Sequence, residues 1–149
     1  MKGYKILIVD DDVEILKVLE LTLSQDYTIL KAQRAQEALD ILSKNEIDLT
    51  IADQRMPGMT GVELLEKTLA YNPHMIKILL TGYTDTENLI RAINQGKVYK
   101  YITKPFKLEE LQLVVKRALE HYETGRENER LYWELQKTHK DLEKDYQKL

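Results

Sequence analysis

The sequence contains no cysteine, no long apolar run and no large excess of either charge. Without cysteine the chain can form neither a disulfide nor a cysteine-ligated metal site. No apolar stretch approaches the roughly 20 residues that a transmembrane helix needs, and three aspartates at residues 10–12 interrupt the only early apolar run, so no signal peptide is indicated. The formal net charge is −3 over 149 residues, which creates no basic field for nucleic acid or an anionic membrane. We therefore expect a cytoplasmic protein, or the cytoplasmic part of one, with no direct nucleic acid binding and no membrane insertion.

Short apolar runs alternate with stretches of helical periodicity along most of the chain. The strand-like runs cover residues 4–9, 27–31, 47–53, 75–81 and 98–102, and apolar residues recur at helical spacing after each of them. Strands that alternate with helices predict a parallel sheet covered by helices on both faces. The chain has no internal repeat, and its length suits one domain with a real core. The sequence therefore predicts an α/β fold, a doubly wound five-stranded parallel sheet.

Two segments have the pattern of a capping box, in which a threonine and a glutamate three residues later satisfy the first amides of a helix. They are Thr60-Gly61-Val62-Glu63 and Thr84-Asp85-Thr86-Glu87. The first predicts the start of the third helix, and the second predicts a fourth helix that ends at Gly96. A fifth helix is expected from Lys107 onward.

Polar residues follow four of the five predicted strands. Asp10 and Asp11 follow the first strand, Asp53 ends the third, Thr81 ends the fourth and Lys104 follows the fifth. In a parallel sheet these ends share one edge, which is where ligands bind. Each residue alone has an ordinary explanation, since an aspartate can cap a helix and a lysine can lie on the solvated surface. The set together favours a common site.

The residue types at this edge suit phosphoryl transfer. Clustered carboxylates repel one another and call for a cation, and Mg²⁺ takes one or two carboxylates together with water and phosphate oxygens. A carboxylate can also attack phosphorus and form an aspartyl phosphate. We expect Asp10 and Asp11 to hold the metal, Asp53 to attack, and Lys104 and Thr81 to contact the phosphoryl oxygens.

Four motifs over roughly residues 3–123 resemble the receiver domain of bacterial two-component response regulators. They are Ile6-Leu7-Ile8-Val9-Asp10-Asp11, Asp53 followed by Met56-Pro57-Gly58-Met59-Thr60-Gly61, Leu80-Thr81-Gly82, and Thr103-Lys104-Pro105-Phe106. The resemblance implies a flavodoxin-like sheet of order 2-1-3-4-5. It also implies a sensor histidine kinase or phosphotransfer protein as phosphoryl donor.

The same resemblance implies roles for individual residues. Asp53 is the expected phosphorylation site, and the metal ligands are expected to be Asp10, Asp11, Asp53 and the backbone carbonyl of Arg55. Thr81 and Tyr101 match the switch residues that change the face formed by the fourth helix, fifth strand and fifth helix, and Lys104 matches the lysine that pairs with the phosphate. The Lys104–Pro105 bond is expected to be cis.

Two other functions remain open on the residues alone. One is a metal-dependent phosphatase or phosphotransferase with an aspartate nucleophile on a similar sheet. Such enzymes often carry a second acid two residues after the nucleophile, where this chain has Arg55. The other is a dimerising scaffold whose acidic site is idle. We favour a signalling switch that accepts a phosphoryl group itself and is not an enzyme acting on a separate substrate.

The C-terminal segment has the pattern of a coiled coil. Leu135, Leu142 and Leu149 are seven residues apart, with Tyr132, His139 and Tyr146 between them at 3,4 spacing. Gly125 weakens the helix locally and marks the expected boundary between a receiver domain at residues 1–124 and a helical extension at 125–149. The extension is expected to form a parallel homodimer or to link the receiver to a further output domain.

Overall fold

The computed structural model describes residues 3–82, 90–91 and 98–147, and for residues 125–126, 128–129 and 139–147 it describes the backbone only. The chain divides into two compact units, Met1–Leu119 and Glu120–Leu149. The expected fourth helix, with its capping box at Thr84, falls largely outside the described residues; Ile90 and Arg91 within it are helical.

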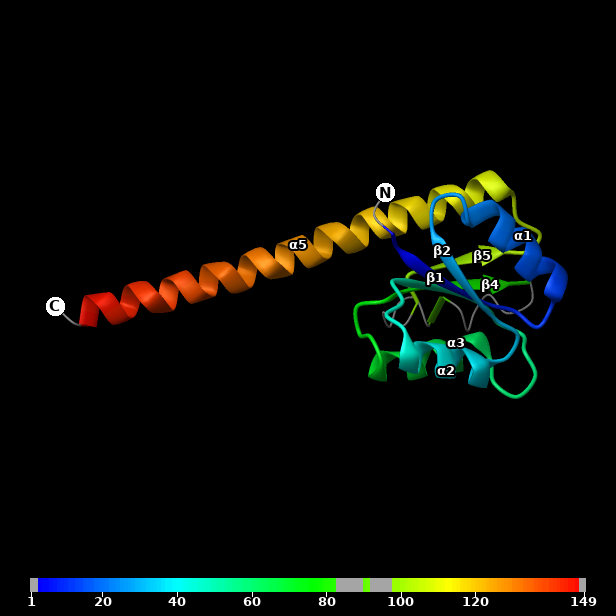
Figure 1. The fold of residues 1–149 in the computed structure, drawn as a ribbon, viewed down its shortest axis with the longest axis horizontal. Coiled ribbons are helices and arrows are strands. Elements are labelled where there is room, and N and C mark those ends of the chain that lie inside the picture. Colours follow the sequence, from blue (N-terminus) through cyan, green and yellow to red (C-terminus); the bar gives the residue numbers. More distant parts are fainter. Residues whose placement is uncertain (1–2, 83–89, 92–97, 148–149) are drawn as a thin grey trace. The chain divides into compact units, whose positions relative to one another are not determined.

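The first unit is built on the predicted five-stranded parallel sheet (Figure 1). Its strands are β1 (Lys5–Val9), β2 (Thr28–Ala32), β3 (Leu49–Asp53), β4 (Ile76–Thr81) and β5 (Lys100–Thr103), in the order β2-β1-β3-β4-β5. This order confirms the flavodoxin-like topology. Every residue of β3 and of β4 is buried, as expected for interior strands of a sheet with helices on both faces.

The helices α1 and α3 each begin at a side chain that accepts a hydrogen bond from one of their first amides. α1 (Val13–Leu23) is capped by Asp12, whose carboxylate accepts a hydrogen bond of 2.9 Å from the Glu14 amide. α3 (Gly61–Lys67) begins after Thr60, whose hydroxyl accepts from the Glu63 amide at 3.2 Å. The threonine half of the first predicted capping box is therefore present. α2 (Ala35–Lys44) begins without a side-chain cap, and a short 3₁₀ turn, η1 (Thr68–Ala70), follows α3.

Helices cover both faces of the sheet. On one face α2 and α3 lie together (Figure 1), and their apolar residues form a buried cluster with Leu7, Val9, Ala52 and Leu79 of the strands. α1 lies on the opposite face, and the first turns of α5 join it there, since the Gln112 side chain donates to the Thr22 carbonyl at 3.3 Å. The core therefore fills the space on each side of β1, β3 and β4, and leaves their carboxyl ends at one edge.

α5 (Leu108–Gln147) is a helix of 40 residues and confirms the predicted C-terminal helix. Its early apolar residues are buried in the first unit, namely Leu111, Val115, Ala118 and Leu119. Between residues 131 and 135, in the second unit, four large apolar side chains of the helix are exposed, namely Leu131, Tyr132, Trp133 and Leu135. Among the described helices, none combines the length and apolarity needed to cross a bilayer.

Candidate functional site

Three carboxylates converge at the edge of the sheet where β1 and β3 end. Asp10 follows β1 directly and is only 1% exposed, Asp11 is exposed, and Asp53 is the last residue of β3 and is buried. One oxygen from each of the three carboxylates lies within 4.8 Å of the others. The sequence separates Asp53 from the other two by more than forty residues, and the pairing of β1 with β3 brings them together.

Lys104 bridges the two buried carboxylates of this group. Its ammonium lies 2.8 Å from Oδ1 of Asp53 and 3.1 Å from Oδ2 of Asp10. Its backbone amide donates to the carbonyl of Thr81 at 2.7 Å, which ties the loop after β5 to the end of β4. The Lys104–Pro105 peptide bond is cis, as the resemblance implied.

The other oxygen of Asp10 is held by the backbone. Oδ1 accepts a hydrogen bond of 2.9 Å from the amide of Asp12, and the amide of Asp10 donates to the carbonyl of Ala32 on β2 at 3.1 Å. Both carboxylate oxygens and the main chain of this residue are therefore fixed. Asp12 in turn caps α1, so the first helix and the acidic group share one loop.

Burial and the neighbouring charges and hydrogen bonds shift the pKa values of two groups in this site. Burial raises the pKa of Asp10, and the charge of Asp53 raises it further, against the lowering effects of the Asp12 amide and of Lys104. Burial alone would lower the pKa of Lys104, but its hydrogen bonds to Asp53 and Asp10 hold that pKa above its ordinary value. The carboxylates therefore stabilise the charge of Lys104, and Lys104 in turn opposes the effect of burial on Asp10.

The donor set fits a hard divalent cation. Three carboxylates at the ends of two strands offer oxygen ligands within the reach of a single ion, and hard cations such as Mg²⁺ prefer oxygen ligands. Lys104 supplies one positive charge to the buried pair of aspartates. A second, divalent charge at the exposed side, beside Asp11, would complete the neutralisation.

The remaining predicted residues, Thr81, Tyr101 and Arg55, do not belong to this charged group. Thr81 is buried at the end of β4, and its hydroxyl donates to the carbonyl of Gly82 at 3.1 Å. Tyr101 is on β5, partly buried, and packs against the core cluster on the α2 and α3 face. Arg55 is exposed in the loop after β3. The structure thus unites Asp10, Asp11, Asp53 and Lys104, and it places Thr81 at the same edge through its carbonyl contact with Lys104.

One residue that the sequence reasoning did not single out is Gln54, directly after Asp53. Its side-chain oxygen accepts from the amide of Val62 at 3.0 Å, its own amide donates to the carbonyl of Leu80 at 2.9 Å, and its carbonyl accepts from the amide of Gly61 at 3.1 Å. The one signal in the sequence for such a role was a polar residue placed between a buried strand and a Pro-Gly turn. Nothing in the pattern says which amide such a side chain will reach.

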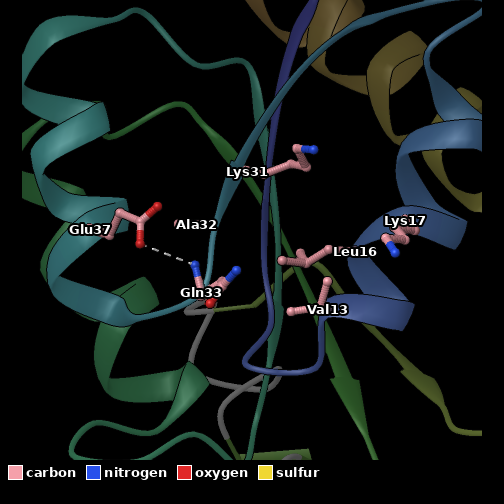
Figure 2. Close-up of a pocket in the computed structure, with 7 residues that line it drawn as sticks. All are labelled: Val13, Leu16, Lys17, Lys31, Ala32, Gln33 and Glu37. Carbon is pink, nitrogen blue, oxygen red and sulfur yellow. Dashed lines mark hydrogen bonds between the residues drawn. The ribbon is translucent and has the colours of Figure 1, made fainter.

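A small hollow lies beside the site, between α1, the end of β2 and the start of α2. It has a volume of about 250 Å³, and Figure 2 shows the seven residues that line it: Val13, Leu16, Lys17, Lys31, Ala32, Gln33 and Glu37. The amide of Gln33 donates to Glu37 at 3.5 Å. Lys17 and Lys31 at its rim are paired with Glu14 and Glu20 of α1, at 3.8 and 2.7 Å. The paired rim gives the hollow little attraction for an anion.

Comparison with known proteins gives a consistent result. The profile of the response regulator receiver domain family matches residues 6–116. Over 119 residues the chain is 41% identical to the regulatory protein VanR of Enterococcus faecium, covering 79% of this chain and 51% of that protein. It is 35% identical to the hydrogenase transcriptional regulatory protein HoxA of Cupriavidus necator, covering 80% of this chain and 25% of that protein.

A solved structure agrees with these relatives. The signal receiver domain of an HD domain-containing protein from Pseudomonas fluorescens Pf-5 superimposes with a TM-score of 0.78 at 38% identity, covering 85% of this chain and 94% of that one. The chain spans between a quarter and a half of the length of the two regulators above.

Proposed function

The chain belongs to the response regulator receiver family, and from that membership we propose that it is a phosphorylation-controlled signalling switch in a two-component phosphorelay. Receiver domains are regulatory modules, and the proposed reaction here is transfer of a phosphoryl group onto the chain itself. The observation that carries the proposal is the bridge from Lys104 to both Asp53 and Asp10 within a group of three carboxylates.

In the proposed reaction a carboxylate oxygen of Asp53 attacks the phosphorus of a phosphohistidine on the donor protein. A P–O bond forms to Asp53 while the P–N bond breaks, and the electron pair of that bond leaves with the imidazole nitrogen. Asp10, Asp11, Asp53 and the carbonyl of Arg55 would hold Mg²⁺, which when bound neutralises charge on the phosphoryl oxygens. Lys104 Nζ, already 2.8 Å from Asp53 Oδ1, would pair with the oxygens that arrive there.

We propose that Thr81 and Tyr101 convert this charge into a change of shape. The Thr81 hydroxyl donates to the carbonyl of Gly82, and a phosphoryl oxygen on Asp53 offers it a more strongly charged acceptor. Turning toward that oxygen would free space beside β5, into which Tyr101 would rotate. The two orientations form a two-state equilibrium at the face of the fourth helix, β5 and α5, and phosphorylation would shift it.

The donor is proposed to be a sensor histidine kinase or phosphotransfer protein that approaches along α1. This helix begins beside the acidic group, at Asp12, and it exposes three large apolar side chains, Val13, Val18 and Leu21. Exposed apolar side chains next to a reactive site favour contact with a partner protein.

Intact-mass measurement after incubation with Mg²⁺ and acetyl phosphate tests the phosphorylation site. The wild-type chain should gain one phosphoryl group and Asp53→Asn should gain none. Asp40→Asn, an exposed residue of α2 outside the site, should behave as wild type. A normal gain in Asp53→Asn would refute the assignment. Hydrolysis of a small phosphoester without any gain of mass would favour the phosphatase alternative instead.

A further inference from the structure

Gln54 joins three elements at the point where β3 leaves the sheet. Its backbone amide continues the pairing with β4 through the carbonyl of Leu80, and its carbonyl accepts from Gly61, the first residue of α3. Its side-chain oxygen accepts from the next amide of the same helix, that of Val62, at 3.0 Å. The residue after the phosphoacceptor therefore carries a double connection to the start of α3.

These bonds close the loop of residues 55–60. Within this loop Gly58 has a φ of 88°, a conformation that a glycine adopts at little cost. Beyond the loop, a Cβ on Gly61 would lie 2.5 Å from the carbonyl oxygen of Asp53, so the helix packs directly on the backbone of the phosphoacceptor. Both ends of the loop are fixed, and its path between them is set by where Gln54 holds α3.

We propose that Gln54 is a positioning residue for the metal site, which acts by fixing the loop that presents the carbonyl of Arg55. The inference rests on the proposed function, in which that carbonyl is a metal ligand. A backbone carbonyl has no side-chain torsions with which to find an ion, so its position depends on the loop that carries it. Hydrogen bonds that orient ligands in this way contribute to metal affinity although they never touch the ion.

Gln54→Leu keeps the size of the side chain and removes the acceptor. The amide of Val62 loses its partner and the loop gains freedom, so binding of Mg²⁺ should weaken by about tenfold, the low end of the range for such orienting contacts. Titration calorimetry with MgCl₂ on the full chain measures this dissociation constant. The phosphorylation rate at saturating Mg²⁺ should stay within about twofold of wild type, because ordering of the loop is then supplied by the ion.

Thr60→Ala is the matched control. It removes the other side-chain cap of the same helix, the hydroxyl that accepts from Glu63, at a stability cost of about 1 kcal/mol. If Gln54 acted only by stabilising α3, both variants would change the Mg²⁺ dissociation constant alike. We expect Thr60→Ala to leave it unchanged.

Val62→Pro removes the donor of the same hydrogen bond, and proline is tolerated in the first turn of a helix. It should weaken Mg²⁺ binding like Gln54→Leu, and the double variant should be no weaker than either alone. Wild-type affinity in a folded Gln54→Leu chain, or fully additive effects in the double variant, would overturn the inference. A wild-type chain that neither binds Mg²⁺ nor accepts phosphate would instead overturn the proposed function.

Discussion

Lys104 holds the acidic group together, because it supplies the positive charge that both buried carboxylates contact. Asp10 and Asp53 are anions that burial disfavours, and the lysine contacts each at hydrogen-bonding distance. Removing one member of a buried charged group leaves its partners uncompensated, which costs more than the group contributes when intact. The lysine side chain is a quarter exposed, so solvent screening reduces this cost.

Lys104→Ala should therefore lower the unfolding free energy in the absence of metal, by roughly 1–2 kcal/mol, and the melting temperature should fall with it. Added Mg²⁺ should raise the melting temperature more than it does in wild type, because the ion then replaces the missing charge. Phosphorylation should produce a weaker response in the amide spectra of β5 and α5. Lys31→Ala, which breaks the surface pair with Glu20, is the control. Equal shifts with Mg²⁺ in Lys104→Ala and wild type would contradict this role.

Lys77 lies on the same strand as Thr81, and its pKa is lowered, whereas the pKa of Lys104 is raised. It is a buried lysine whose ammonium donates to the carbonyl of Met75 at 3.2 Å, and burial lowers its pKa from the ordinary value of 10.5. The folded protein holds this proton less firmly than the unfolded chain does. The cost of the buried charge is therefore fully present below the folded pKa and disappears as the pH rises toward 10.5.

Lys77→Met should stabilise the protein at neutral pH, by about 1 kcal/mol or a few degrees in melting temperature. The gain should shrink as the pH rises toward 10.5, because the wild-type lysine is then neutral in the folded protein. Thermal unfolding followed by circular dichroism between pH 7 and 10 measures it, with the exposed Lys17→Met as control. A gain that does not depend on pH would mean that packing, and not charge, is the cause.

The residues of the site and the buried Lys77 differ in how far the sequence could predict their roles. Asp10, Asp53 and Lys104 were predictable because each stands at the end of an apolar run, and a parallel sheet gathers such ends. Gln54 and Lys77 were not predictable in the same way. The role of a side-chain amide depends on which donor lies within about 3 Å, and a lysine within an apolar run does not reveal whether its ammonium reaches solvent.

At the scale of single elements, α3 packs directly against the backbone of Asp53, the proposed phosphoacceptor. The start of α3 followed from local chemistry: Pro57 and Gly58 end the strand segment, and Thr60 caps the helix. The apolar runs and the handedness of the crossovers predicted a doubly wound parallel sheet, whereas its strand order was implied by the resemblance to receiver domains. The closeness of α3 to β3 could not be read from these patterns, because it depends on a missing side chain at Gly61 whose neighbours are distant in sequence.

Gly61→Ala should separate the effect of helix propensity from the effect of steric contact with the sheet. Helix propensity alone predicts a gain of up to about 1 kcal/mol, but the added Cβ would lie 2.5 Å from the Asp53 carbonyl and 2.7 Å from Leu79 Cδ1. We expect sterics to prevail, with a loss of about 1–3 kcal/mol in unfolding free energy by urea denaturation. Gly82→Ala, whose Cβ would meet nothing within 4 Å, should be close to neutral. A stabilised Gly61→Ala would show that the helix moves away at little cost.

At the scale of the whole molecule, the second unit leaves apolar surface that its own helix cannot bury. Isolated helices are marginal in water, yet Leu131, Tyr132 and Leu135 are exposed on one side of α5. Arg130 forms ion pairs with Glu127 and Glu134 on another side of the same helix. A helix with an ion-paired surface and an apolar stripe is typical of a strand of a coiled coil.

We therefore predict that two copies of the chain pair in parallel through the stripe of Leu135, Leu142 and Leu149, with Tyr132 beside it. Sedimentation of the full chain should show a dimer, and a chain truncated after residue 124 should be monomeric. Leu135→Glu places two like charges in the seam and should shift the full chain toward monomer. Trp133 packs edge-on against Tyr132 at a ring distance of 6.2 Å but lies outside the seam, so Trp133→Ala should leave the dimer intact.

Pairing through this helix would give the proposed phosphorylation switch a means of transmission. If α5 is shared between the receiver and the seam, a change at β5 and the start of α5 alters how two receivers can pack without breaking the coil. Phosphorylation should then change the sedimentation coefficient of the dimer more than its dissociation constant. A full chain that stays monomeric at high micromolar concentration, phosphorylated or not, would remove the dimer from the mechanism and leave the switch to act within a single receiver.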